Sequence, residues 1–287
     1  MSDLSQHHRF SHQAMTTTFE ILIDGHEEKY AAQAATEAFD VLNRLEAQLS
    51  RYRESSDVTQ LNQAPVNTPV LLSLETFACL EQARQLFEWT DGLFDVTVGR
   101  WTHETPASGK PAKREAFPMT LNVDELTGMR LLDDVAVDLG GIGKGFALDI
   151  LAQHLAPWQV TQALLHSGGS TALALDAPSD TRGWPLTISD PHDASHIFKR
   201  FNLKNSALAG SAQIERNHIV TPTTGGKRTR HSATWALAPT GALADGLSTA
   251  FTMMKSDAIR KLCDTHPGLG GAIIEGDEVF TVHGLFK

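Results

Sequence analysis

The chain has 287 residues, a formal net charge of −10 and an ordinary apolar content of 41%. A chain of this length can bury a full core, and its acidity disfavours general binding to nucleic acids or anionic membranes. The sequence has no apolar run long enough to span a membrane, and its N-terminal region has neither a secretion signal nor a lipid-attachment cysteine. We therefore expect a cytoplasmic protein, unless a leader has been removed.

Short strands and long helices are predicted to alternate along the first half of the chain. Residues 14–23 are rich in β-branched side chains and predict a strand. Residues 27–50 place Ala and Leu at helical spacing, and Ser73 is a typical cap for a second helix. Residues 109–118 show no periodicity and predict an exposed excursion, and residues 122–137 then predict a hairpin.

A polar stretch between the first two helices contains Arg51, Tyr52 and Arg53. One interpretation is a solvated helix end. The alternative is a ligand contact, in which Tyr52 stacks on a flat ring and the arginines lie near phosphate. The stretch alone does not decide between the two.

Residues 135–149 form the stretch around which the chain is organised. A short apolar strand is expected up to Asp138, four glycines occupy the six positions 140–145, and a helix pattern follows over residues 146–155. This arrangement is a common way to bring backbone N–H groups close to a phosphate, although the spacing matches neither a P-loop nor a dinucleotide fingerprint. The glycines are therefore either turn and packing residues or, together with the Lys144 cation, part of an anion site.

Most of the second half predicts short strands joined by glycine turns. Residues 163–175 predict a strand, a turn and a strand, and Ala209-Gly210-Ser211 predicts a break after the pattern of residues 198–208. Further strands are expected at residues 185–189, 218–226, 232–238, 271–274 and 279–282. With the helices, these strands predict an α/β (α+β) fold of mixed, mainly antiparallel sheets with flanking helices.

Residues 242–254 predict a helix in which Asp245 and Thr249, four residues apart, share one face. A carboxylate beside a hydroxyl suits a hard divalent cation, Mg²⁺ above all. The alternative is that Asp245 caps the helix and Thr249 lies at the edge of the core. The local sequence leaves both interpretations open.

Seven segments in order along nearly the whole chain resemble the ApbE family of FAD:protein FMN transferases. The most specific are residues 92–99 and 137–145, followed by residues 244–250. The resemblance implies one catalytic domain over residues 1–287, with an FAD cleft between two subdomains as one option. The other matching segments are residues 14–20, 50–53 with 61–62, 167–169 and 218–225.

The resemblance also implies a reaction. Such an enzyme binds FAD with Mg²⁺, breaks its pyrophosphate and passes FMN to a Ser or Thr hydroxyl of an acceptor flavoprotein, while AMP leaves. Asp245, Thr249 and the backbone carbonyl of Gly141 would hold the cation. His218 would take the proton of the acceptor hydroxyl, a role that suits imidazole at neutral pH. The residues that would contact FAD are Met15, Tyr52, Asp138, Gly140, Gly143, Lys144 and Ile219.

The chain departs from the family pattern at several of these places. Thr16 replaces a Gly, Ser170 and Thr221 each replace an Asp, and Ala209-Gly210-Ser211 stands in place of Thr-Ser-Gly. Two acids are lost and the cation ligands are kept, a pattern that favours binding of FAD and Mg²⁺ over transfer. Three functions stay open: the transferase, an FAD pyrophosphatase that uses water as acceptor, and an FAD-binding protein without turnover.

Overall fold

The structure, a computed structural model, describes residues 7–102, 114–179, 181–212, 222, 229–275 and 279–285. Its centre is an eight-stranded sheet in the order β1-β2-β6-β7-β10-β11-β12-β13, and every neighbouring pair is antiparallel. The strands are β1 (His8–Ala14), β2 (Thr17–Ile23), β6 (Ala163–Ser167), β7 (Thr171–Ala174), β10 (Ser206–Ala212), β11 (Ala233–Ala238), β12 (Gly270–Glu275) and β13 (Val279–Gly284).

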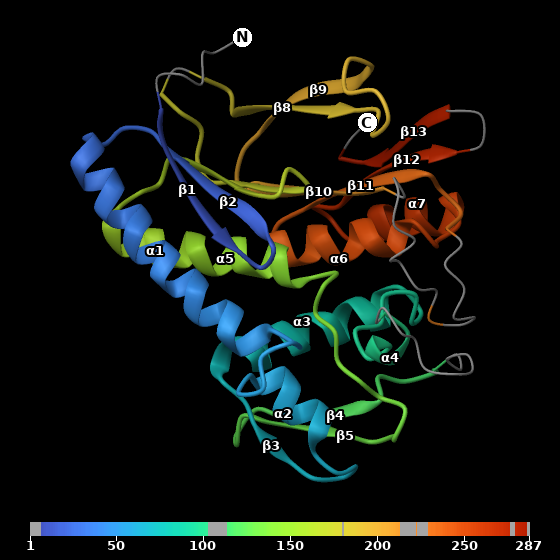
Figure 1. Cartoon of the computed structure of the whole chain (residues 1–287). Coiled ribbons are helices and arrows are strands. Elements are labelled where there is room, and N and C mark those ends of the chain that lie inside the picture. Colours follow the sequence, from blue (N-terminus) through green and yellow to red (C-terminus); the bar gives the residue numbers. More distant parts are fainter. Residues whose placement is uncertain are drawn as a thin grey trace.

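Helices cover one face of this sheet and a β-hairpin lies on the other (Figure 1). The helices are α1 (Glu28–Leu49), α5 (Gly143–Leu155) and α6 (Gly241–Phe251), with α7 (Ser256–Thr265) beside β12 and β13. The hairpin consists of β8 (Trp184–Ser189) and β9 (Ile197–Leu203). The main apolar core fills the space between the helices and the sheet, and a second apolar cluster lies under the hairpin.

A smaller part of the molecule lies beyond the helical layer (Figure 1). It contains the three-stranded sheet β3-β5-β4 and the helices α2 to α4. Leu61 and Met119 from this part belong to the same apolar cluster as Phe19 and Leu165 from the large sheet, so the described parts of the chain share one core. The bounds are α2 (Asp57–Gln63), β3 (Val70–Leu71), α3 (Leu74–Trp89), α4 (Gly99–Thr102), β4 (Met119–Asn122) and β5 (Thr127–Arg130).

The predicted fold class is confirmed, as are most helices and strands. The predicted helix over residues 27–50 is α1, and Ser73 caps α3 by accepting a hydrogen bond from the Thr76 N–H at 3.2 Å. The hairpin expected over residues 122–137 is formed by β4 and β5, which start three residues earlier and end at Arg130. The strand expected at residues 218–226 lies, apart from Pro222, outside the described residues.

The strand predicted over residues 14–23 is confirmed only from Thr17, because the chain turns just before that residue. Strand β1 ends at Ala14 and β2 begins at Thr17, and the turn residues Met15 and Thr16 have φ of +49° and +60°. Two-residue turns with positive φ at both positions usually carry Gly or Asn, so their absence here concealed the turn. A β-branched residue such as Thr16 adopts this conformation only at a cost of about 1–2 kcal/mol.

Two further strand predictions are corrected by the structure. Residues 135–138 are extended but form no strand; Ala136 makes an isolated parallel bridge with Val98. The predicted break at Ala209-Gly210-Ser211 lies inside β10, which follows β9 after a short turn. Small residues suit that strand because a Cβ at position 210 would lie 2.8 Å from the Trp235 ring.

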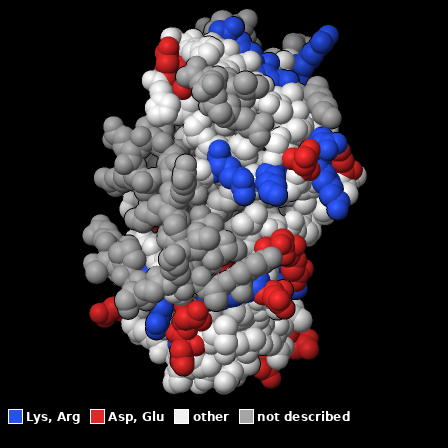
Figure 2. Space-filling model, turned by 90° about the vertical axis from the view of Figure 1, so that its right-hand side faces the viewer, with Lys and Arg blue, Asp and Glu red and all other residues white. Residues whose placement is uncertain are grey.

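Charged side chains of both signs share the face drawn in Figure 2. Lys and Arg are interspersed there with Asp and Glu, and several acidic side chains group towards its lower end. The described part of this face therefore presents no single continuous basic surface of the kind that binds nucleic acid. Within the described ranges, every helix is too short or too polar to cross a bilayer.

Candidate active site

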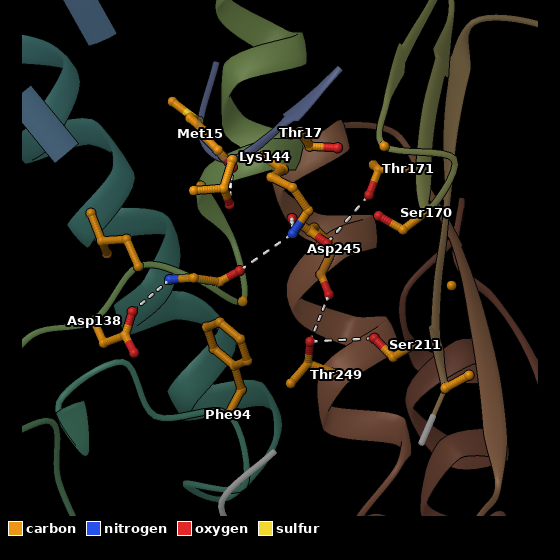
Figure 3. Close-up of a pocket in the computed structure, with 18 of the residues that line it drawn as sticks. Met15, Thr17, Phe94, Asp138, Lys144, Ser170, Thr171, Ser211, Asp245 and Thr249 are labelled. Atoms are coloured by element: carbon orange, nitrogen blue, oxygen red, sulfur yellow. Dashed lines mark hydrogen bonds and ion pairs between the residues drawn. The ribbon is translucent and has the colours of Figure 1, made fainter. Parts of the chain in front are cut away.

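A cavity of about 1100 Å³ brings together residues from both halves of the chain. It lies where the N-terminal end of α5 and the middle of α6 meet the β1–β2 and β6–β7 turns and the loops after α1 and α3 (Figure 3). Nine of the residues predicted from the sequence line it: Met15, Tyr52, Asp138, Gly140, Gly141, Gly143, Lys144, Asp245 and Thr249.

Helix α6 presents Asp245 and Thr249 on one face, as predicted (Figure 3). The Asp245 carboxylate, in a residue only 5% exposed, accepts hydrogen bonds from the Gly145 N–H at 3.0 Å and from the Thr171 hydroxyl at 3.3 Å. Burial raises the pKa of Asp245, and the Lys144 ammonium, 4.0 Å away, acts in the opposite direction. A buried carboxylate with so few donors gains stability from any further cation beside it.

The glycine loop comes close to Thr249. A Cβ built on Gly141 would lie 3.6 Å from the Thr249 hydroxyl and 3.2 Å from the Phe94 ring. A carboxylate and a hydroxyl beside this loop suit Mg²⁺, which prefers oxygen ligands and keeps several of its waters or substrate phosphates. Among the described residues, no cluster of three His, Cys, Asp or Glu side chains offers a competing metal site. The residues present therefore fit Mg²⁺.

The loop glycines serve close packing and not positive φ. A Cβ on Gly145 would lie 2.0 Å from the carbonyl oxygen of Gly241, and a Cβ on Gly241 would lie 2.3 Å from the carbonyl oxygen of Gly145. None of the four glycines between residues 140 and 145 has a positive φ. Helices α5 and α6 therefore touch backbone to backbone, and this contact holds the Gly145 N–H against Asp245.

Asp149 is a functional residue that the sequence interpretation missed. From α5 it accepts hydrogen bonds from the Gly241 and Ala242 N–H groups, at 2.6 and 2.9 Å, and so caps the start of α6. The predicted cap, Asp245, lies one turn further along, and Thr240 is the N-cap residue. Burial raises the pKa of Asp149 to about 6. The sequence did contain a signal for this role, because Asp149 lies in an apolar helix and a buried carboxylate needs hydrogen-bond partners.

Asp138 lines the same cavity and is already held by protein groups. Its carboxylate accepts from Arg51 and Thr102, each at 2.5 Å, and from the Gly140 N–H at 3.0 Å. Arg51 also donates to the Tyr52 hydroxyl at 2.7 Å and lies over its ring. Tyr52 is 75% exposed, so it stands at the cavity rim with a free ring face.

The substituted positions that the structure describes lie around the same cavity. Thr16, Ser170 and Ser211 all line it. The Ser211 hydroxyl lies 2.9 Å from that of Ser248 and 3.5 Å from that of Thr249, so it faces α6 beside the candidate cation ligands (Figure 3). The sequence interpretation treated this serine as part of a break and missed that contact. Glu46 was also missed; it accepts the Met15 N–H at 2.7 Å.

Three predicted or substituted positions, His218, Ile219 and Thr221, lie outside the described residues. Pro222 is described and lines the cavity. The excursion expected at residues 109–118 is described only from Arg114, whose guanidinium lies 3.1 Å from Asp95.

Comparisons with known proteins agree with the geometry. An FAD:protein FMN transferase of Haemophilus influenzae is 27% identical over 302 residues, covering 94% of this chain and 87% of that protein. One of Treponema pallidum is 26% identical, covering 85% and 78%. Among solved structures, an ApbE protein of Thermotoga maritima has a TM-score of 0.83 at 23% identity, covering 98% of both chains. The flavin transferase ApbE of Vibrio cholerae has a TM-score of 0.81 at 22% identity, covering 96% and 97%.

The two solved structures show the same fold. Their sequence identities to this chain are too low to support a conclusion about function. The sequence profile of the ApbE family matches residues 15–273, which is most of the chain and includes both the glycine loop and α6. The chain therefore belongs to the ApbE family.

Proposed function

We propose that this protein is an FAD:protein FMN transferase that transfers FMN from FAD to a Ser or Thr hydroxyl of an acceptor flavoprotein and releases AMP. The observation that carries the proposal is the meeting of Asp245, Thr249 and Gly141 at one end of a cavity of about 1100 Å³. That volume suits a ligand as large as a dinucleotide. The curated relatives bear the same activity in their names.

Asp245, Thr249 and the Gly141 carbonyl would hold Mg²⁺ at the pyrophosphate. When bound, the cation would neutralise phosphate oxygens as negative charge moves to the leaving AMP. Lys144 supplies a second positive charge 4.0 Å from Asp245. The start of α5 at Gly143 adds the positive end of a helix dipole.

The flavin would extend from this site towards Met15 and Tyr52. Tyr52 offers an aromatic face at the rim, and Asp138 holds Arg51 beside it. Gly140 and Gly143 lack side chains, so the backbone can approach the ligand closely. Ile219 is expected to contribute an apolar contact on the strength of the family resemblance alone.

His218 is the proposed acceptor of the hydroxyl proton. Its imidazole can take a proton at neutral pH, and its position in the sequence matches that of a His in the family pattern. The support for this role is the sequence resemblance.

An FAD pyrophosphatase is the second candidate. Ser170 lines the cavity where the family pattern has an acid, so the acceptor side of the site has lost a carboxylate. Water could then compete with a protein hydroxyl. A binding protein without turnover is the third candidate, and the kept pair of Asp245 and Thr249 argues against it.

Incubation of the purified protein with FAD, with and without Mg²⁺, tests the proposal. We expect AMP, measured by chromatography, to form only with Mg²⁺, and Asp245→Ala to slow its formation by about 100-fold or more, because the metal contributes several kcal/mol. Mass spectrometry then separates the candidates: FMN bound to an acceptor protein indicates the transferase, and free FMN indicates the pyrophosphatase. FAD that stays intact under all conditions would contradict both.

A further inference from the structure

The main cavity is not confined to the helical side of the large sheet. Alternate residues of a strand point to opposite faces. On β10, Ala209 belongs to the core under the helices, whereas Leu208 belongs to the cluster under the β8–β9 hairpin. The cavity is lined by Ser211 and Thr171 from the helical face and by His166, Leu208 and Gly210 from the hairpin face. It therefore passes around the tip of the β6–β7 hairpin, at residues 168–170, to the other side of the sheet.

On that side the cavity runs along the open edge of β8. Among the described residues, β8 pairs with β9 alone, so its other edge has no partner strand, although Pro185 has no N–H to offer there. Leu186, Thr187 and Ser189 of this strand all line the cavity. Because the consecutive residues 186 and 187 point to opposite faces of the strand, a space that touches both follows the strand's edge. Trp184 and Ile188 fix the hairpin to the sheet by apolar contacts.

A second cavity, of about 430 Å³, adjoins the first on this side. Both are lined by Thr17, His166, Gly168 and Gly169, and Thr18 and Glu20 complete the second. The space beside the turn is open, since a Cβ built on Gly169 would meet no atom within 4 Å. The lining of this region mixes glycine and hydroxyl side chains with the larger side chains of His166, Leu186, Leu208, Trp235 and Glu20.

We propose that the acceptor protein enters on this side, as an extended segment that pairs with the open edge of β8 and places its hydroxyl at residues 168–170. This inference rests on the proposed function. A strand edge without a partner can form a series of hydrogen bonds with another extended backbone, and a small molecule cannot form such a series.

The chemistry requires such a second route. The acceptor oxygen forms a bond to the FMN phosphorus, and the bond from that phosphorus to the oxygen bridging to AMP breaks. AMP leaves with that oxygen, and the hydroxyl proton passes to a base, for which His218 is the candidate. Since the attacking and leaving oxygens lie roughly in line, the acceptor and the AMP group occupy opposite sides of the phosphorus. FAD and the acceptor therefore need separate approaches to the Asp245 site.

Blocking the β8 edge tests the path without touching the FAD contacts. The variant Thr187→Trp fills the cavity beside the edge, and Ser189→Trp does so two residues later. The matched control is Asn202→Trp on the partner strand, at an exposed position outside both cavity linings. The acceptor probe is a pool of synthetic nonapeptides with a central Thr and randomised flanking residues. Each protein is assayed for FAD affinity, for AMP release with Mg²⁺ and for FMN-bearing peptide by mass spectrometry.

We expect the wild type and Asn202→Trp to label peptides equally. Thr187→Trp and Ser189→Trp should label them at least tenfold more slowly, with FAD affinity within twofold of the wild type. Labelling by both blocked variants at the wild-type rate would overturn the path. So would a wild type that binds FAD and releases AMP but labels no peptide, because an extended segment would then not suffice. Loss of FAD binding and AMP release in the wild type itself would instead overturn the proposed function, and the path with it.

Discussion

The Asp245 end of the cavity is built on two helices in direct contact and on strand β7, whereas Arg51 and Tyr52 stand on a turn after α1. At the first end, a carboxylate in a residue 5% exposed is held by Gly145 and Thr171, and a glycine pair locks the helices together. At the second, the ring of a residue 75% exposed is held by its neighbour Arg51. The groups beside the expected phosphate and cation are therefore held firmly by the protein. The ring on which the flavin would rest is held less firmly.

Breaking the helix contact should produce the largest effect on stability. In Gly145→Ala the new Cβ would collide with the Gly241 carbonyl oxygen, at 2.0 Å in the present backbone. We expect a loss of about 3 kcal/mol in the free energy of unfolding, measured by urea denaturation, because neither backbone can yield cheaply. The control is Gly143→Ala, where the nearest atom to a new Cβ is 3.9 Å away. An equal effect of the two substitutions would contradict the special role of residue 145.

Replacing Asp149 should change the way in which the stability of the protein depends on pH. Burial raises the pKa of Asp149 to about 6 from an ordinary value of 3.8, so between these pH values the folded protein holds a proton that the unfolded chain has lost. The stability from this group is therefore present below pH 3.8 and lost as the pH rises to about 6. Asp149→Asn should lack that loss, which amounts to about 3 kcal/mol.

Urea denaturation of both proteins at pH 4.5 and pH 7 measures this difference. The Asn variant should gain stability relative to the wild type as the pH rises. Parallel curves would show that the caps at Gly241 and Ala242 cost nothing in desolvation.

The smallest effect is expected at the loop end. Asp138→Asn keeps the side-chain shape but weakens the pairing with Arg51, which lies at 2.5 Å and is partly exposed. We expect FAD affinity to fall by roughly tenfold, with Mg²⁺ affinity unchanged, because the pair shapes the rim and not the cation site. Calorimetry measures both, with Asp124→Asn on an exposed turn as control. A parallel loss of Mg²⁺ affinity would mean that the two ends are coupled.

Local patterns in the sequence placed Asp245 and Thr249 on one helix face, and the family resemblance, not the pattern, favoured them as cation ligands. Asp245 and Thr249 are four residues apart on one helix, so helical periodicity alone places them together. The glycine run indicated a close backbone contact. The residue on the other side of that contact, Gly241, belongs to another helix and could not be predicted. Asp149 was missed for the same reason: its partners are N–H groups ninety-two and ninety-three positions away.

Local sequence patterns gave wrong predictions where tertiary contacts override local conformational preference. Met15 and Thr16 form a turn without the usual Gly or Asn, because the Met15 N–H is held by Glu46 of α1 and the flanking strands pair in register. Residues 209–211 lie within a strand because their small side chains fit against Trp235 and α6. In both cases the deciding contact comes from a distant part of the chain.

A crystal structure of the protein with FAD and Mn²⁺ in place of Mg²⁺ would test the central claim most directly, since anomalous scattering locates the metal. We expect one Mn²⁺ peak, bound by the Asp245 carboxylate, the Thr249 hydroxyl and the Gly141 carbonyl, next to the FAD pyrophosphate. The flavin should be directed towards Tyr52. A metal bound elsewhere, or a pyrophosphate far from α6, would contradict it.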